Sequence, residues 1–401
     1  MSTERVDPQP DFLAPDFVRD PYPTLAALRE RAAAVFDPSW QGWWALRDAE
    51  MTDLLRSPRF AKSPAKALDG PYTRVLGGGG HSSMLFMDDP DHARVRGLVS
   101  RAFTKKAVEE RAGDVQRVAD ELLDAVAPDQ PFDLIAAFAS PLPIIVIAEM
   151  LGIEPDRRAD FKRWSDDGAL SFDPFLGPDQ AERVRRSAED LRAYLGSVVE
   201  QRRAQPQSDL TSALVTAQAA DGDRLSETEL VDVLGLLLAA GNITTTDLIG
   251  NGIAAFLRHP EQWNLLCRDP TLAEAAVEEV LRFDSSVVMT ERIALADETI
   301  GGCPVSARQW VWAILASANR DPSLHPDPDR FDIERADDTH HSFGGGPHLC
   351  LGAPLARLEA KVAFSTLARR FPDLHVAERT ARLDYKLAPG FRGLNALWVE
   401  A

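Results

Sequence analysis

The chain has 401 residues, of which 45% are hydrophobic and 26% charged, and its formal net charge at pH 7 is −18. This length allows one large domain or two or three smaller ones, and the composition excludes disordered, collagen-like and disulfide-rich classes. The acidic excess argues against a nucleic-acid partner, and the three cysteines (Cys267, Cys303 and Cys350) are too few for a secreted disulfide framework, which indicates a cytoplasmic protein.

The N-terminal segment MSTERVDPQPDF is charged and proline-rich, so it predicts neither a signal peptide nor a membrane anchor. The most apolar stretch of the chain, residues 233–246, is uncharged and bounded by Asp232 and Asp247. It is shorter than the ~18 apolar residues expected of a membrane span. We therefore interpret it as part of a buried core helix and expect no membrane partner.

The first elements in chain order are a helix over residues 22–36 and a strand over residues 40–46. Residues 63–90 carry several prolines and the glycine run Gly77–Gly80, which predicts an irregular, mobile stretch. Helical periodicity dominates after that stretch. The predicted helices cover residues 92–102, 108–126, 140–151 and 180–203.

Residues 227–258 form the longest predicted helix, about 48 Å at 1.5 Å per residue. Ser226 and Glu229 form a capping-box pattern at its start, and Pro260 follows its end. Its middle is apolar on all sides, which indicates burial. Helices at 261–268 and 271–283 and β-prone runs at 291–294 and 309–315 come next.

Residues 319–350 contain no convincing helix or strand, and a structureless stretch of that length is usually functional. It ends at Cys350, where a clear helix begins with an apolar stripe. The fold class predicted from these elements is mostly α with a minor β component.

Cys350 lies at the start of that helix and follows the glycine-rich segment 344–347. The free N–H groups and the dipole of a helix N-terminus lower the pKa of a thiol, which favours a thiolate here. Glycines let the backbone approach a bulky group closely. The alternative, a small buried apolar residue, is the interpretation that we adopt for Cys267 and Cys303.

The segment Phe343–Gly352 reads FGGGPHLCLG and resembles the haem-binding loop of the cytochrome P450 family, Phe-Gly-x-Gly-x-His-x-Cys-x-Gly, at every fixed position. The resemblance implies that Cys350 ligates the iron of haem b (iron protoporphyrin IX, heme b), with Phe343 and His348 beside the cofactor. A thiolate ligand favours O–O cleavage, so it implies oxygen activation.

Glu279 and Arg282 match the Glu-x-x-Arg motif of the same family, and Arg335 matches its second arginine. The resemblance implies that these three residues form a structural ion cluster, which holds the long irregular segment against the core. The alternative is an ordinary i,i+3 ion pair on a surface helix.

The family resemblance also implies four partners for the two haem propionates: His92, Arg96, Arg292 and His348. His92 and Arg96 are four residues apart, which places them on one face of a helix. A solvated charge is the alternative for any one of them, but the four matches occur in family order.

Residues 239–246 of the long helix read AAGNITTT and resemble the oxygen-binding groove of the family, with Ala240 and Gly241 beside the haem and Thr244 as the catalytic hydroxyl. The family has Asp or Glu directly before this threonine, whereas this chain has Ile243. Asp247, three residues after Thr244, is our candidate replacement for proton delivery. The alternative is that Asp247 pairs with a neighbouring helix.

The resemblance covers nearly all of residues 1–401 and implies one cytochrome P450 domain without a membrane anchor or a fused reductase. It implies a monooxygenase that takes electrons from a ferredoxin or flavodoxin with its reductase. One rival is a peroxygenase, suggested by the missing acid, although the retained Thr244 counts against it. The other is a non-catalytic haem-thiolate sensor or carrier, which turnover of a substrate would exclude.

Basic residues near the predicted propionate helix form a candidate docking face for an acidic redox partner, with a solvated face as the alternative: Arg94, Arg101, Lys105 and Lys106. The substrate itself is expected to be a hydrophobic small molecule, such as a terpenoid, a fatty acid or an aromatic. The pocket residues that we predict are Leu85, Phe86, Leu237, Val288 and Phe391.

Overall fold

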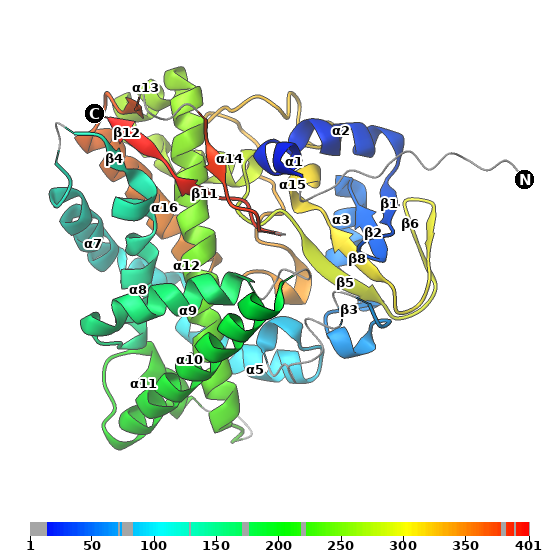
Figure 1. Cartoon of the computed structure of the whole chain (residues 1–401), viewed down its shortest axis with the longest axis horizontal. Helices are drawn as coiled ribbons and strands as arrows, with labels where there is room; N and C mark the ends of the chain where they lie inside the picture. The colour runs from blue at the N-terminus through cyan, green and yellow to red at the C-terminus, as the bar shows by residue number, and fades with distance from the viewer. Residues whose placement is uncertain are drawn as a thin grey trace, which may run out of the picture.

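The computed structural model describes residues 14–70, 73, 83–127, 130–170, 176–217, 222–377, 382–388 and 390–400. Helices fill one side of the molecule, and the main sheet lies at the other side (Figure 1). The fold is mostly α with a minor β component, so the predicted fold class is confirmed.

The α-helices of five residues or more are α1 (Pro15–Arg19), α2 (Tyr22–Arg31), α3 (Asp48–Arg56), α5 (Asp91–Val99), α6 (Lys105–Glu109), α7 (Ala112–Asp124), α8 (Pro141–Leu151), α9 (Arg158–Leu170), α10 (Pro178–Ala204), α11 (Leu210–Thr216), α12 (Glu227–Arg258), α13 (Pro260–Arg268), α14 (Ala273–Phe283) and α16 (Ala353–Arg370). Shorter helical turns include η2 (Met84–Phe86), α15 (Leu315–Ala318) and η7 (Gly346–His348).

The main sheet has the strand order β1-β2-β8-β5-β3, in which β2 and β8 pair in parallel and the other neighbours are antiparallel. Its strands are β1 (Ala34–Asp37), β2 (Gly42–Ala45), β3 (Phe60–Ala61), β5 (Thr290–Ala294) and β8 (Trp310–Ala313). The smaller sheets consist of β6 (Glu298–Ile300) with β7 (Cys303–Val305), β10 (Asp384–Tyr385) with β11 (Leu394–Ala396), and β4 (Phe132–Asp133), β12 (Trp398–Glu400) and β9 (His375–Val376).

Helix α12 crosses the whole molecule and contacts α8, α9, α10 and α16 (Figure 1). The capping box is present, because the backbone N–H of Glu229 donates to Oγ of Ser226 and the N–H of Ser226 donates to Oε2 of Glu229. By length and composition α12 is apolar enough to cross a membrane, but 61% of its most apolar 18-residue window is buried inside the protein. It therefore meets the description of a core helix.

Some predicted helices differ from the observed ones in their bounds, and others were not predicted. The first predicted helix ends at Arg31, because residues 34–37 pair antiparallel with Gly42–Ala45 as strand β1. The helix predicted over 108–126 is divided into α6 and α7. Helices α1, α3, α9 and α11 were missed. Of these, α1, α3 and α11 have five, nine and seven residues, and so short a segment gives few helical turns from which periodicity can be recognised.

Residues 319–350 contain, as predicted, no α-helix or strand and only the short turn η7. Of the stretch predicted to be mobile, residues 63–90, Pro71 and the run Gly77–Gly80 lie outside the described residues. Its described parts include the turn η2 and the start of the segment that leads into α5. The irregular segment 319–350 leads directly to the site described next.

Candidate active site

Cys350 opens onto a cavity of about 330 Å³ between α12 and the N-terminal end of α16. Most of its wall is apolar, and polar groups gather at one part of it. Residues predicted for the cofactor or the substrate that line this cavity are Leu85, His92, Arg96, Leu237, Ala240, Gly241, Thr244, Phe343, His348, Cys350 and Phe391. The tertiary structure thus brings eleven predicted residues from distant parts of the chain to one space.

The loop that carries Cys350 packs tightly on the end of helix α3. Gly346 has φ +65°, and a Cβ atom at this position would lie 2.4 Å from the carbonyl oxygen of Leu55. Only glycine fits both this conformation and this close approach. The backbone N–H of Cys350 donates to the carbonyl oxygen of Phe343 over 2.9 Å. These contacts fix the direction in which the cysteine side chain leaves the loop.

Burial raises the pKa of the Cys350 thiol above its ordinary value. The backbone N–H groups of Gly352 and Ala353 and the charge of Arg96 act in the opposite direction but are outweighed. The predicted lowering by the helix N-terminus is therefore present, but desolvation of the thiolate outweighs it, so the expected net lowering of this pKa is not found.

The polar part of the cavity wall is strongly cationic. The rings of His92 and His348 lie 4.0 Å apart, and Nη2 of Arg96 donates to the carbonyl oxygen of Leu349 over 2.6 Å. Burial and the charges of Lys62, His92, Arg292 and Arg96 together lower the pKa of His348 to about 2. His348 is therefore neutral near pH 7, and the charged members of this group are Lys62, Arg96 and Arg292.

Arg292 does not line the cavity itself, although it is buried beside it. Its Nη1 donates to the carbonyl oxygen of Glu291 over 2.7 Å, and its Nη2 donates to that of Leu55 over 3.4 Å. Contact of Arg292 with a propionate would therefore require a different rotamer or an approach of the ligand toward strand β5.

These groups fit a haem with two anionic propionates. Nε2 of His92 is buried and has no hydrogen-bond partner among the described residues, which is costly unless a ligand supplies one. An apolar space, a cysteine at one wall and an uncompensated cationic rim are together what a porphyrin with a thiolate ligand requires.

Three consecutive threonines of α12 make three different contacts. Oγ1 of Thr244, which faces the cavity, donates to the carbonyl oxygen of Ala240 over 2.7 Å. Thr245 hydrogen-bonds to the carboxyl group of Glu359, and Oγ1 of Thr246 donates to Asn242. Thr244 and Thr245 both line the cavity, but the hydroxyl of Thr245 is engaged by Glu359, whereas that of Thr244 bonds only to its own helix among the described residues.

Asp247 faces away from Thr244 toward a neighbouring cavity of about 490 Å³. Nζ of Lys386, which follows strand β10, donates to Oδ1 of Asp247 over 2.6 Å, and burial raises the pKa of Asp247 to about 6. Its partner is thus a residue of the C-terminal β region and not of a neighbouring helix. Ile243 lines both cavities and lies between Asp247 and the haem cavity.

Glu279, Arg282 and Arg335 meet beside the irregular segment; Glu279 and Arg282 are buried, and 12% of the Arg335 side chain is exposed. Arg282 donates to both carboxylate oxygens of Glu279, over 2.7 and 2.9 Å, and Nε of Arg335 lies 3.3 Å from Oε2. The remaining guanidinium N–H groups donate to backbone carbonyl oxygens of the irregular segment, which are those of Asn319, Pro326, Asp327, Pro328 and Arg330. One carboxylate and two guanidiniums thus hold a segment that has no regular secondary structure.

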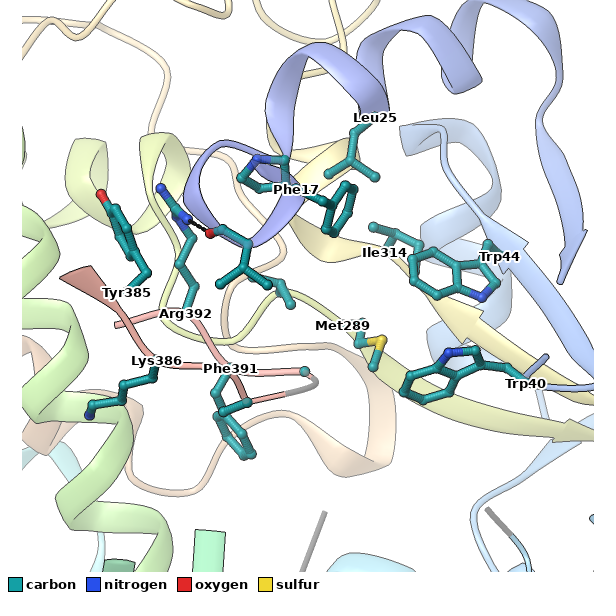
Figure 2. A pocket seen from close by; sticks show the side chains of 15 residues that line it. Phe17, Leu25, Trp40, Trp44, Met289, Ile314, Tyr385, Lys386, Phe391 and Arg392 are labelled. Atoms are coloured by element: carbon teal, nitrogen blue, oxygen red, sulfur yellow. Dashed lines mark hydrogen bonds between the residues drawn. The ribbon is translucent and has the colours of Figure 1, made fainter. Parts of the chain in front are cut away.

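Two predicted pocket residues lie outside the lining of the haem cavity. Val287 and Met289 line it, whereas Val288 lines a smaller apolar pocket of about 60 Å³, because side chains alternate along an extended segment. Figure 2 shows this pocket, with Phe17, Trp40 and Trp44 along its wall. Phe86 is buried in the core at the end of turn η2.

Phe391 lines all three cavities: the haem cavity, the apolar pocket and the cavity at Asp247. It lies near Lys386 and Arg392 in the segment between β10 and β11 (Figure 2). The backbone N–H of Val288 donates to the carbonyl oxygen of Gly390 over 3.0 Å, which ties this segment to the cavity wall. Phe391 is therefore the side chain that separates the three spaces.

Sequence reasoning missed three buried charged groups in the cavity wall: Lys62, Glu291 and Glu359. Lys62 and Glu291 form an ion pair, and burial raises the pKa of Glu359 to about 8. The only local signal was a charged residue in an apolar context, for example Glu359 nine residues after Cys350 on the predicted helix. Nothing local indicated which of these charges are buried.

Comparison with known proteins agrees with this site. Residues 268–388 match the family model described as Cytochrome P450. The cytochrome P450 monooxygenase PikC of Streptomyces venezuelae is 40% identical over 395 residues, which cover 97% of this chain and 92% of that protein. The vitamin D(3) 25-hydroxylase of Pseudonocardia autotrophica is 37% identical over 98% of this chain and 96% of its own length.

Among solved structures, the myxobacterial cytochrome P450 CYP267B1 in complex with myristic acid has a TM-score of 0.90 at 37% identity, with 98% of this chain and 99% of that chain covered. The fold and the cysteine cavity define a haem-thiolate protein. The chain belongs to the cytochrome P450 family. It is a haem b-dependent monooxygenase, which inserts one oxygen atom from O₂ into an organic substrate with electrons from separate redox proteins.

Replacement of Glu279 by alanine should cost about 3–5 kcal/mol of stability, because two buried guanidiniums lose their counter-charge. Thermal unfolding and the haem content of the purified protein measure the effect. Glu182→Ala, which breaks i,i+3 and i,i+4 pairs with Arg185 and Arg186 on the exposed face of α10, is the control and should leave thermal unfolding and haem content unchanged. Equal losses in the two variants would contradict a structural role for the cluster.

Proposed function

We propose that Cys350 would hold the haem iron as a thiolate and that the substrate is a hydrophobic small molecule that would bind in the same cavity, next to Thr244. The observation that carries this proposal is that Cys350 of the loop and Thr244 of α12 open onto one mostly apolar cavity. The rim of His92, Arg96, Arg292 and His348 would then hold the propionates. When bound, the haem supplies oxygen activation, which a thiolate ligand favours.

The residues of the chain perform the remaining tasks. The apolar wall, which includes Leu85, Leu237 and Phe391, excludes water and binds the apolar body of the substrate. The hydroxyl of Thr244 can accept a hydrogen bond while it donates to Ala240, so it can position a polar atom within the cavity. Ala240 and Gly241 leave room beside α12 because their side chains are small or absent.

We propose a ferredoxin or a flavodoxin, with its reductase, as the electron donor. Lys105 and Lys106 are exposed at the start of α6, which packs against α16, the helix that follows Cys350, and their charge suits an acidic partner. Arg94 is less available, because it pairs with Asp223 and Glu229. The three cysteines are free, which supports a reducing cytoplasmic location.

The ligand assignment predicts a spectroscopic loss in Cys350→Ser. The reduced carbon monoxide complex of the wild-type protein should show the red-shifted Soret band of thiolate ligation, and the serine variant should lack it. Cys267→Ser is the matched control, since this thiol lies outside the cavity lining, and it should keep the band. A red-shifted band in Cys350→Ser would refute the assignment.

The propionate assignment predicts weaker haem retention in the double variant Arg96→Ala/Arg292→Ala. Each guanidinium should contribute one charge-assisted bond of about 1.5–3 kcal/mol. Transfer of haem to excess apomyoglobin measures the rate of loss. The double variant Arg117→Ala/Arg185→Ala, which removes two exposed arginines of α7 and α10, is the control. Identical transfer rates in the two double variants would exclude this role.

We also propose that Asp247 delivers protons to the cavity. It would replace the acidic residue that the family has directly before the threonine, where this chain has Ile243. Lys386 is partly exposed, so the pair with Asp247 links solvent to the interior, and a water beside Ile243 would complete the route to Thr244. Asp247→Asn should lower the ratio of product to NAD(P)H consumed and raise peroxide release, whereas Ile243→Glu should keep or raise that ratio.

Glu359→Gln serves as the comparison for this relay, because Glu359 is the other buried acid near the threonines of α12. An unchanged ratio of product to NAD(P)H in Asp247→Asn would rule out the relay through Asp247. A lowered ratio in Glu359→Gln alone would assign proton delivery to that side of α12. Product formed from hydrogen peroxide alone at an equal rate would instead favour the peroxygenase.

A further inference from the structure

Lys62 and Glu291 form a buried ion pair in the wall of the haem cavity. The exposed fractions of their side chains are 3% and 11%, and both residues line the cavity. Nζ of Lys62 donates to a carboxylate oxygen of Glu291 and, over 3.3 Å, to Oγ1 of Thr290. Burial of a lysine is expensive, and a buried ion pair seldom repays that cost by its own attraction. The pair therefore calls for a functional explanation.

Lys62 lines the same cavity as the proposed propionate partners His92, Arg96 and His348, so it belongs to the same cationic rim. The backbone N–H of Lys62 also donates to Oδ1 of Asp88 over 2.7 Å, just before the helix α5 that carries His92 and Arg96. Strand β5 supplies Glu291 and Arg292 from the other side.

The charge balance of the rim favours a dianionic ligand. Lys62, Arg96 and Arg292 carry three positive charges, and Glu291 carries one negative charge, which leaves two positive charges to be balanced. The negative charge of Asp88 does not change this net charge of +2, because the positive charge of Lys66 pairs with it over 2.9 Å. Two propionates supply two negative charges.

We propose that Lys62 is a further cofactor-binding residue, whose ammonium donates a charge-assisted hydrogen bond to a haem propionate while Glu291 positions it. An ammonium has three N–H donors, and among the described residues Glu291 and Thr290 accept two. The remaining donor suits an anionic oxygen. The proposal rests on the proposed haem site, but the thiolate spectrum of the wild-type protein tests that site independently.

The test compares Lys62→Met with wild type after reconstitution with haem and with the iron protoporphyrin IX dimethyl ester, whose propionates carry no charge. Transfer to excess apomyoglobin is measured for each. Loss of a charge-assisted bond should accelerate haem transfer about 10-fold or more in Lys62→Met. With the diester, the two proteins should transfer the cofactor at the same rate. Lys66→Met, which removes an exposed lysine four residues away, should match wild type with both cofactors.

Because Lys62→Met leaves the carboxylate of Glu291 buried without its partner, the double variant Lys62→Met/Glu291→Gln is measured as well. Removal of both charges should restore the thermal stability of the apoprotein relative to Lys62→Met. Haem transfer should remain as fast as in Lys62→Met. Acceleration of equal size with haem and with the diester would overturn the proposal, as would slow haem transfer in the double variant. Either result would show that Lys62 only neutralises Glu291.

Discussion

The buried carboxylate of Glu279 is the group on which the active site depends. Arg282 and Arg335 both contact it, and their remaining N–H groups donate to backbone carbonyl oxygens between residues 319 and 330. This segment forms no helix or strand, so few of its carbonyl groups are paired with backbone N–H groups, and side chains must donate hydrogen bonds to the others. The carboxylate and the two guanidiniums are largely removed from water together, so the opposite charges stabilise one another. Loss of the carboxylate would leave both guanidiniums without their counter-charge.

The segment held in this way delivers Cys350 to the wall of a mostly apolar cavity. Burial raises the pKa of the thiol, and the backbone N–H groups at the start of α16 compensate only in part. On the same wall, Nε2 of His92 is buried and has no hydrogen-bond partner among the described residues. An iron ion bound to the thiolate and a propionate beside His92, as we propose for this site, would relieve both costs.

Helix α12 and the segment between β10 and β11 divide the interior on the other side of the cysteine. Thr244 faces the haem cavity, and Asp247, less than one helical turn further on, faces a different one. Phe391 separates both from the apolar pocket near Trp40 and Trp44. The proton route that we propose through Asp247 and the apolar wall that we propose for the substrate would thus lie on different faces of one helix.

The sequence by itself determined the class of fold and the long core helix, through periodicity and a capping box at Ser226. The set of residues around Cys350 follows from the resemblance of the ten-residue motif and of other segments to the cytochrome P450 family. Only the tertiary structure decided that Lys62 and Glu291 are buried together, that Val288 faces another pocket and that Asp247 pairs with Lys386. The physical reason is that burial and pairing of a charge depend on residues more than a hundred positions away, about which a local pattern carries no information.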